Sequence, residues 1–372
     1  FHNKRGASMI RRPVSIYDCS FIADLIGRIV FMNVGVIGTG AIAWKHAQAY
    51  KNIGYTVSAC TNTNPEKGKK FAEAWGAEFV DTPEELGKRA DVDFLDVCTF
   101  PGYRLAAVEL GAKHGKHVLV QKPMAVDLET ATKMINVARE AKIQLGVVSQ
   151  HRFDDSTLFL QKAIAAGRLG RILQADAYVK WHRTDEYYAR PVKGSWAGEG
   201  GGALISQAIH QVDVLLHLIG AVDEVFGYWH LGATHKIESE DLVCAVMKYR
   251  SGATGVFQAA TALWPGCSER IEIHGTKGSA IVTGDQLTTW DVKDDSGEPA
   301  PVSQVSKSGA FDPMAISLAP FERQLADFGD ACKAGRASSS SGAEGYRALQ
   351  LVRAIYESCR EGRKVQVETV KK

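Results

Sequence analysis

The sequence feature that constrains the fold most is a glycine-rich turn at residues 38–43, which reads Gly-Thr-Gly-Ala-Ile-Ala. It lies between an apolar run at 34–37, typical of a buried strand, and a helical pattern at 41–51. In such a turn the first glycine permits a tight bend, the second lets the backbone approach a pyrophosphate, and the last alanine lets the helix pack closely on the sheet. We expect a dinucleotide at the helix N-terminus, bound by Gly38, Thr39, Gly40, Ala41 and Ile42.

Strands and helices alternate through the first half of the chain, which favours a dinucleotide site over an ordinary glycine turn. The predicted strands are 34–37, 56–60, 92–99, 117–120 and 144–149, and the predicted helices are 41–51, 65–75, 105–114 and 127–142. Thr82 and Glu85 form a capping box that begins a further helix. Strands separated by helices of this length form a parallel sheet covered on both faces. We predict an α/β, doubly wound Rossmann domain over residues 32–152.

The second half has a different rhythm. The predicted strands 172–183, 242–249, 254–262, 271–274 and 279–283 have few helices between them, which indicates an open, mostly antiparallel sheet. Helices are predicted at 156–166, 203–219, 321–332 and 345–359, and a loop at 293–308. We predict a substrate-binding and oligomerisation domain of the α+β class over residues 153–372, with the last helix packing back towards the first domain.

Charge and cysteine usage exclude some classes of function. The 44 Lys plus Arg nearly balance the 42 Asp plus Glu, so we expect no nucleic-acid partner. The seven cysteines are scattered without a C-x-x-C pair, which indicates free thiols in a reducing compartment. Asp18, Asp24 and Arg28 interrupt the apolar residues before Met32. We expect no membrane span, a cytoplasmic location, and a peripheral extension, native or added by cloning, at residues 1–31.

The segment after the second predicted strand bears on the choice of nucleotide. An acidic residue roughly 20 positions beyond the glycines binds the adenosine ribose and favours NAD. Residues 60–64 read Cys-Thr-Asn-Thr-Asn and offer no carboxylate. Asn62 or Thr63 can hydrogen-bond a 2′-phosphate, with lysines nearby, but no arginine decides the choice. The sequence therefore leaves NADP and NAD open, with a slight lean to NADP.

Two further motifs carry a resemblance to a known family. Gln-Lys-Pro at 121–123 follows a predicted strand, and Gly-Gly-Gly-Ala-Leu-Ile-Ser-Gln-Ala-Ile-His-Gln-Val-Asp occupies 200–213. In these motifs the chain resembles the glucose-fructose oxidoreductase, inositol dehydrogenase and rhizopine-catabolism family, over nearly everything after Met32. The resemblance implies a Rossmann domain followed by an open-sheet domain whose outer face makes a dimer or tetramer. It also implies that Lys122 and His210 flank the nicotinamide and the reacting hydroxyl.

The chemistry of an alcohol oxidation supports the same two residues. Hydride leaves a carbinol carbon only as the hydroxyl proton is removed, so a base must reach that oxygen. Lys122 at a strand end is suited to this, and His210 can share or relay the proton. Further cofactor contacts are expected at the strand ends from Thr99, Pro101, Gln121 and Lys122.

Two residues depart from the family pattern. Gln121 stands where the family has glutamate, so Lys122 lacks a negative neighbour that would favour its ammonium form. Ser206 stands where the family has Asp or Asn, one helical turn before His210. Because a serine is a poor unaided base, we assign Ser206 to positioning and proton transfer to Lys122 and His210.

Other residues in the second half have two interpretations. His210, Asp213 and His217 share a helix face, but no further ligand cluster accompanies them, so we expect no metal. Residues 181–188 and 193–196 mix aromatic and polar groups as sugar pockets do, although the tryptophans fit equally well as packing at a domain junction. The candidate substrate contacts are Trp181, Arg183, Tyr188, Trp196, Gln207 and His210.

These features predict an NAD(P)-dependent oxidoreductase acting on a CH-OH carbon of a sugar, sugar acid, nucleotide sugar or cyclitol. Two other functions remain open. The first is a glycoside hydrolase, because some relatives cleave glycosides by transient oxidation without consuming NAD. The second is a non-catalytic nucleotide sensor. Absorbance of reduced nicotinamide during turnover separates the oxidoreductase from these two.

Overall fold

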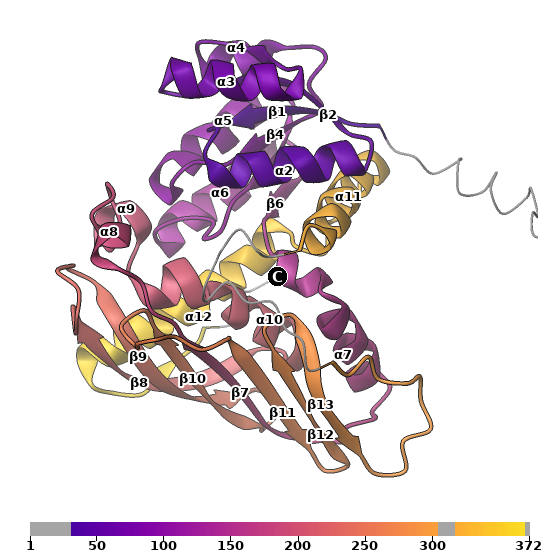
Figure 1. Cartoon of the computed structure of the whole chain (residues 1–372), viewed down its shortest axis with the longest axis vertical. Helices are drawn as coiled ribbons and strands as arrows, with labels where there is room; N and C mark the ends of the chain where they lie inside the picture. The colour runs from indigo at the N-terminus through magenta and orange to yellow at the C-terminus, as the bar shows by residue number, and fades with distance from the viewer. Residues whose placement is uncertain (1–30, 304–316, 369–372) are drawn as a thin grey trace, which may run out of the picture.

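The computed structural model describes residues 31–303 and 317–368 (Figure 1). All of the predicted N-terminal extension except Phe31, and residues 304–308 of the predicted loop, lie outside the described part. Two sheets organise the chain, and helices from its last third lie between them.

The first sheet has six parallel strands in the order β3-β2-β1-β4-β5-β6, which confirms the predicted doubly wound fold. The strands are β1 (Asn33–Ile37), β2 (Thr56–Thr61), β3 (Glu78–Phe79), β4 (Phe94–Val97), β5 (His117–Val120) and β6 (Leu145–Val147). Five helices connect them: α2 (Ala41–Asn52), α3 (Pro65–Trp75), α4 (Pro83–Lys88), α5 (Arg104–His114) and α6 (Leu128–Glu140). The sequence did not predict β3, because two residues are too few to show a periodicity.

The register aligns the carboxyl ends of the central strands. Ile37 pairs with Thr61 and with Val97, Val97 pairs with Val120, and Val120 pairs with Val147. The residues that follow each strand therefore emerge at one edge of the sheet. This edge receives the glycine turn, the segment after β2, the loop after β4 and the Gln-Lys-Pro motif.

The second sheet has eight strands in the order β13-β12-β11-β7-β10-β9-β8-β14. Strands β7 and β10 run parallel and the other neighbours antiparallel, which confirms the predicted open, mostly antiparallel sheet. The strands are β7 (Ile172–Lys180), β8 (Val222–Leu231), β9 (Glu240–Tyr249), β10 (Thr254–Ala260), β11 (Arg270–Gly275), β12 (Gly278–Thr283), β13 (Gln286–Val292) and β14 (Val365–Gln366). Strand β8 escaped prediction because Asp223, Glu224 and Gly227 obscure its alternation.

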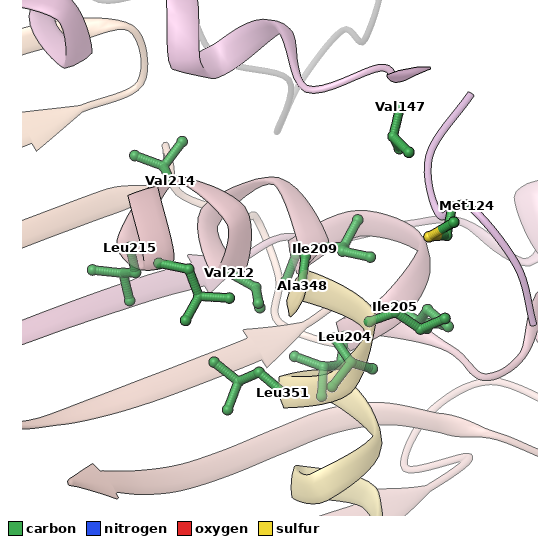
Figure 2. Packing of buried hydrophobic residues seen from close by; sticks show 14 of the residues in the cluster. Met124, Val147, Leu204, Ile205, Ile209, Val212, Val214, Leu215, Ala348 and Leu351 are labelled. Atoms are coloured by element: carbon green, nitrogen blue, oxygen red, sulfur yellow. The ribbon is translucent and has the colours of Figure 1, made fainter. Parts of the chain in front are cut away.

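Helices cover one face of the second sheet (Figure 1). They are α7 (Asp155–Ala165), α10 (Ile209–Ile219) and α12 (Gly342–Glu361), whereas α11 (Ala319–Ala334) packs beside α2 on the first sheet. Figure 2 shows Leu204, Ile209, Ala348 and Leu351 within the buried cluster of this region, with Met124 and Val147 from the first sheet's side nearby. The core is thus continuous between the two sheets.

The C-terminal part of the chain reaches the first sheet. The amide of Val147 in β6 donates to the Ser340 carbonyl (2.8 Å), and Gln324 Nε2 of α11 donates to the Val147 carbonyl (2.9 Å). At Gly345 of α12 an added Cβ would lie 2.5 Å from a Val147 methyl carbon, so this glycine permits close packing. These contacts hold α11 and α12 against the edge strand of the Rossmann sheet.

One predicted helix differs in its winding. The sequence predicts a regular helix through 203–219, but residues Leu204–Ala208 form a π-helix (η3) before α10 begins. Because a π-turn holds more residues than an α-turn, Ser206 and His210 do not have the α-helical spacing that we expected. Within the described residues, Trp196–Ile219 is long and apolar enough to cross a membrane, but 78% of its most apolar window is buried in the fold, as in a core helix.

Candidate active site

The glycine turn has the geometry that a pyrophosphate requires. Gly38 has a φ of +89°, a left-handed conformation that favours glycine, and its amide donates to the Thr61 carbonyl (2.9 Å). An added Cβ at Gly40 would meet nothing within 4 Å, so this side of the turn is open to a ligand. Ala43 is fully buried, as close packing of α2 on the sheet demands.

Helix α2 has no side-chain cap, in contrast to α3, α4 and α6. Asn64, Thr82 and Asp127 cap α3, α4 and α6 with their side chains, whereas Gly40 supplies none to α2 and its first turn holds no acidic residue. The first amides of α2, at Ala41 and Ile42, therefore face the open side with the positive end of the helix dipole. The turn fits the phosphates of a dinucleotide.

The end of β2 connects to this turn through side chains. Asn62 Nδ2 donates to the Thr39 hydroxyl (2.5 Å), and Asn62 Oδ1 accepts the amide of Asn64 (2.9 Å). Thr63 is exposed beside them. Two of the predicted cofactor contacts, Thr39 and Asn62, are thus held against each other.

A buried arginine that the sequence did not single out ties together the ends of β4 and β5. Arg104 Nε donates to the Thr99 carbonyl (3.1 Å), and its Nη1 donates to the carbonyls of Gln121 and Pro123. Burial lowers the pKa of Arg104 to about 9. Through these bonds Arg104 fixes the loop that carries Thr99 and η1 (Pro101–Tyr103) beside the Gln-Lys-Pro segment.

The side chain of Gln121 points into a buried network. Its Nε2 lies 2.9 Å from His46 Nε2, and His46 Nδ1 lies 2.7 Å from Asp96 Oδ2, which also accepts from Tyr50 (3.0 Å). His46, Asp96 and Cys98 are grouped closely enough to hold a metal ion. Burial, followed by the Asp96 charge, raises the pKa of Cys98 well above its usual value, which opposes the thiolate that a metal needs. We interpret this group as a hydrogen-bonded support for the end of β5.

The amine of Lys122 lies at the carboxyl end of β5. Its Nζ donates to the carbonyl of Ser206 in η3 (2.9 Å). Burial, followed by the charge of Lys193, lowers the pKa of Lys122 to about 7, and Arg104 and Arg183 contribute in the same direction. Lys122 can therefore gain and lose a proton near neutral pH.

Ser206 holds Lys122 through its backbone. Its hydroxyl donates to the Gly202 carbonyl (2.8 Å), so the positioning role that we assigned to this residue falls on the carbonyl oxygen. The start of η3 is anchored by the buried Glu240, which accepts the amides of Gly202 and Leu204 (both 2.8 Å). A Cβ at Gly202 would lie 1.8 Å from the Glu240 carbonyl oxygen, so only glycine permits this approach.

His210 and Lys122 line the same small cleft, together with Ser149 and Asp213. Burial, followed by the charges of Lys122 and His151, lowers the pKa of His210 well below its usual value. His210 is therefore neutral at physiological pH and can accept or pass a proton without holding it.

A larger cavity of about 160 Å³ lies on the other side of Lys122, towards the glycine turn. It brings together the predicted residues Ile42, Thr99, Pro101, Gln121, Lys122 and Ser206. Lys193 and Glu199, which form an ion pair, complete its wall, and the sequence did not identify either as a site residue. Lys193 belongs to the Lys-Gly-Ser-Trp segment at 193–196, which the sequence singled out, whereas Glu199 lies after that segment.

The predicted substrate residues fall into two groups. Arg183 lies over the Trp181 ring (4.8 Å), and its Nη2 donates to Gln207 Oε1 (3.3 Å), next to the helix of His210. Tyr188 shares a hydrogen bond with the Thr261 hydroxyl (2.6 Å) after β10. The ring of Trp196 packs against Trp229 and Tyr356, and its Nε1 donates to the Glu238 carbonyl. Of the predicted substrate residues, His210 lines the small cleft, and neither cavity is lined by the others, which are Trp181, Arg183, Tyr188, Trp196 and Gln207.

Asp213 lines the cleft but is paired. Arg152 Nε and Nη2 donate to its two carboxylate oxygens (2.7 and 2.6 Å), and Arg152 also pairs with Glu344 of α12 (3.0 Å). This buried, bidentate pair joins η2 (Gln150–Phe153), α10 and α12. We therefore assign the carboxylate of Asp213 a structural role.

Comparison with known protein families identifies the family of this chain. A model described as an oxidoreductase family with an NAD-binding Rossmann fold matches residues 32–149, and the GFO/IDH/MocA C-terminal domain matches residues 157–281. The chain belongs to the GFO/IDH/MocA family. The resemblance drawn from the motifs is thereby confirmed, and the chain is an oxidoreductase with an NAD(P)-binding Rossmann domain.

Curated GFO/IDH/MocA relatives match along nearly their whole length. The chain is 28% identical to a 1,5-anhydro-D-fructose reductase from Ensifer adhaerens, covering 90% of this chain and 98% of the relative. It is 27% identical to a myo-inositol 2-dehydrogenase from Thermotoga maritima, covering 91% and 99%. These relatives are named for reactions on a sugar derivative and a cyclitol.

Solved structures of similar proteins share the fold. The WlbA dehydrogenase from Bordetella pertussis, in complex with NADH and UDP-GlcNAcA, has a TM-score of 0.80 at 29% identity and covers 91% of this chain and 99% of its own. A levoglucosan dehydrogenase in complex with NADH has a TM-score of 0.81 at 21% identity, covering 91% and 100%, and supports the fold alone.

Proposed function

We propose that this protein is an NAD(P)-dependent dehydrogenase or reductase acting on a CH-OH carbon of a sugar, sugar acid, nucleotide sugar or cyclitol. The observation that carries the proposal is the placement of Lys122. Its amine lies between the cavity that reaches the glycine turn and the cleft shared with His210. The relatives, named for a sugar derivative and a cyclitol, support the substrate class.

The proposed mechanism assigns one task to each residue. When bound, the nicotinamide supplies the hydride acceptor or donor. Lys122 takes the hydroxyl proton during oxidation, since its pKa of about 7 makes the neutral amine available near neutral pH. His210, held neutral, hydrogen-bonds the same substrate oxygen. The Ser206 carbonyl orients the amine of Lys122.

Substrate recognition is proposed for polar residues that lie near the start of the His210 helix, next to the residues that line the cleft. Arg183 and Gln207, joined by a hydrogen bond, offer a cation and an amide to substrate hydroxyl or anionic groups. The hydroxyl of Tyr188 adds a further polar group to these two. The Trp181 ring packs against the Arg183 guanidinium. Trp196 holds its own segment in place through its contact with Tyr356.

A substrate screen tests the function. Purified protein with NAD or NADP is offered myo-inositol, levoglucosan, aldoses, uronic acids and UDP-GlcNAcA, and the absorbance of reduced nicotinamide is followed. Net reduction of cofactor supports the dehydrogenase. Release of an aglycone from a glycoside without net reduction would instead identify a hydrolase, and cofactor binding without any product would identify a sensor.

The pH dependence of oxidation should report on Lys122. The amine must be unprotonated to accept the hydroxyl proton, so kcat/KM for oxidation should rise with pH up to about 7 and level off above it. The reduction direction needs the ammonium and should show the opposite dependence. A profile measured from pH 5 to 9 without an inflection near neutrality would contradict this role.

For the cofactor, we propose a modest preference for NADP. A carboxylate at the end of β2 would repel a 2′-phosphate. This chain presents Asn62 and Thr63 there instead, and the Asn62 side chain is held by Thr39. Fluorescence titration should give tighter binding of NADPH than NADH. Asn62→Asp should reverse the preference, by about tenfold, through repulsion of the phosphate. Tighter binding of NADH by the unaltered protein would refute the proposal.

We also propose a cytoplasmic, homo-oligomeric protein. The six described cysteines outside residues 1–30 are all free, in keeping with a reducing compartment. The face of the large sheet opposite α10 and α12 exposes Tyr228 (67%) and Val246 (54%), apolar groups that a second subunit would cover. Light scattering should give two or four times the mass of the chain, and a monomer would contradict the assignment.

A further inference from the structure

A histidine that the mechanism above leaves unused lies beside the proposed catalytic pair. His151 belongs to η2, directly after the end of β6, and its ring meets the His210 ring edge to face at a centroid distance of 5.0 Å. Its Nδ1 lies 2.7 Å from Asp154 Oδ2, and both side chains are almost completely enclosed. His151 thus lies between the Asp154 carboxylate and the neutral His210 ring. An imidazole in this position can transfer a proton from one to the other.

We propose that His151 and Asp154 form the path by which the substrate proton leaves the site. The inference rests on the proposed dehydrogenase function and deepens it. During oxidation the hydroxyl O–H bond breaks and its proton joins the Lys122 amine, while the C–H bond breaks and its electron pair passes with the hydride to the oxidised nicotinamide. The ammonium of Lys122 then loses this proton, by way of His210, to the His151 imidazole, and Asp154 passes it to water.

Charges around the two histidines set the direction of this transfer. The charged groups that act on His151 are Asp154, Glu269 and Lys122, and those that act on His210 are Lys122 and His151. Burial lowers the pKa of His151, but the Asp154 carboxylate and then Glu269 raise it, so that it lies above the usual value. The pKa of His210 is shifted in the opposite sense. A proton that reaches His210 is therefore held more strongly by His151.

The carboxylate end of the pair opens onto a second cavity. Asp154 lines a space of about 260 Å³ together with Asp155, Asp285, Ser317 and Arg323. This cavity is separate from the cleft of Lys122 and His210, which Asp154 does not line. It is polar and large enough for several water molecules, and its carboxylates can accept a proton. His151 and Asp154 thus link the reacting end of the site with a polar exit.

The neighbouring arginines fix this geometry. Arg323 Nη1 donates to the Phe153 carbonyl (2.7 Å), and its Nη2 pairs with Asp155 (2.7 Å). Arg152, the residue after His151, is anchored by Asp213 and Glu344. The segment that carries the histidine is therefore held on both sides, and replacing the imidazole alone leaves these anchors in place.

The test compares His151→Asn with the unaltered protein, using the panel substrate that gives the highest rate. Asparagine can still hydrogen-bond Asp154 but cannot carry a proton, so kcat for oxidation should fall at least about tenfold at neutral pH. The solvent deuterium isotope effect on kcat should rise, and added imidazole, as an external proton carrier, should restore part of the rate. Binding of NADPH, followed by fluorescence, should remain unchanged. His114→Asn is the matched control, because His114 also pairs with a carboxylate, Glu84 (3.1 Å), but outside the site.

The outcomes separate this proposal from the proposed function. If the unaltered protein reduces no cofactor with any substrate, the dehydrogenase assignment itself fails. If His151→Asn retains the kcat, pH profile and isotope effect of the unaltered protein, the proton path is refuted while the dehydrogenase stands. A loss of rate without imidazole rescue, with a lowered melting temperature, would also overturn the path by assigning His151 to stability.

Discussion

Lys122→Met should lower turnover at least about a hundredfold while leaving cofactor affinity nearly intact. Methionine keeps the unbranched apolar stem of lysine but has no group that can take the hydroxyl proton. Gly38 is bonded to Thr61 and Asn62 to Thr39, whereas the amine of Lys122 is bonded to Ser206, so loss of the amine should leave the contacts to the cofactor phosphates in place. Turnover is measured from reduced nicotinamide, and affinity from fluorescence titration with NADPH.

Lys122→Arg is the matched control for this prediction. Arginine retains a positive charge in the cleft but does not release its proton near neutral pH, so it should be nearly as inactive as methionine. Loss of rate in both variants separates proton transfer from simple charge stabilisation. Unchanged turnover in Lys122→Met would remove Lys122 from the mechanism.

Arg104→Met should lower the free energy of unfolding by about 3 kcal/mol, because the buried carbonyls of Thr99, Gln121 and Pro123 lose their donor. Each orphaned carbonyl costs roughly 1–3 kcal/mol. Relief from burying the cation, whose pKa is lowered to about 9, offsets part of this sum. The same change should weaken cofactor binding about tenfold, since the loop of Thr99 and Pro101 loses its tie to β5. Denaturant unfolding and fluorescence titration measure the two effects.

Arg104→Lys provides the comparison. Lysine keeps the charge and can donate to one or two of the three carbonyls, so it should recover part of both losses. If Arg104→Met has the same stability and cofactor affinity as the unaltered protein, the two strand ends are held by other contacts.

The sequence predicted the parts of the site that short motifs encode. The glycine turn, the Gln-Lys-Pro segment and the helix of His210 each follow from local patterns, and the parallel register brings the first two to one edge. The roles of Arg104, His151 and Glu240 could not be predicted, because each depends on contacts between segments far apart in the chain. Glu240, for example, accepts amides 36 and 38 residues away.

Some local signals were present but ambiguous. Three successive glycines at 200–202 indicate close backbone approach, yet only the structure shows that Gly202 lies against Glu240. Ser206 was assigned to positioning from its type, whereas its hydroxyl is used within the helix and its carbonyl contacts Lys122. The π-helical winding of Leu204–Ala208 has no signature in the apolar pattern, since its side chains are as apolar as those of α10.

The account depends on where the nicotinamide ring binds, and a crystal structure of the protein with NADP(H) tests this most directly. We predict that the pyrophosphate lies at the N-terminus of α2 and that the reactive carbon of the ring faces the Lys122 amine and the His210 imidazole. A ring that lies outside the cavity between the glycine turn and Lys122, or that turns its reactive carbon away from both residues, would contradict the proposed function.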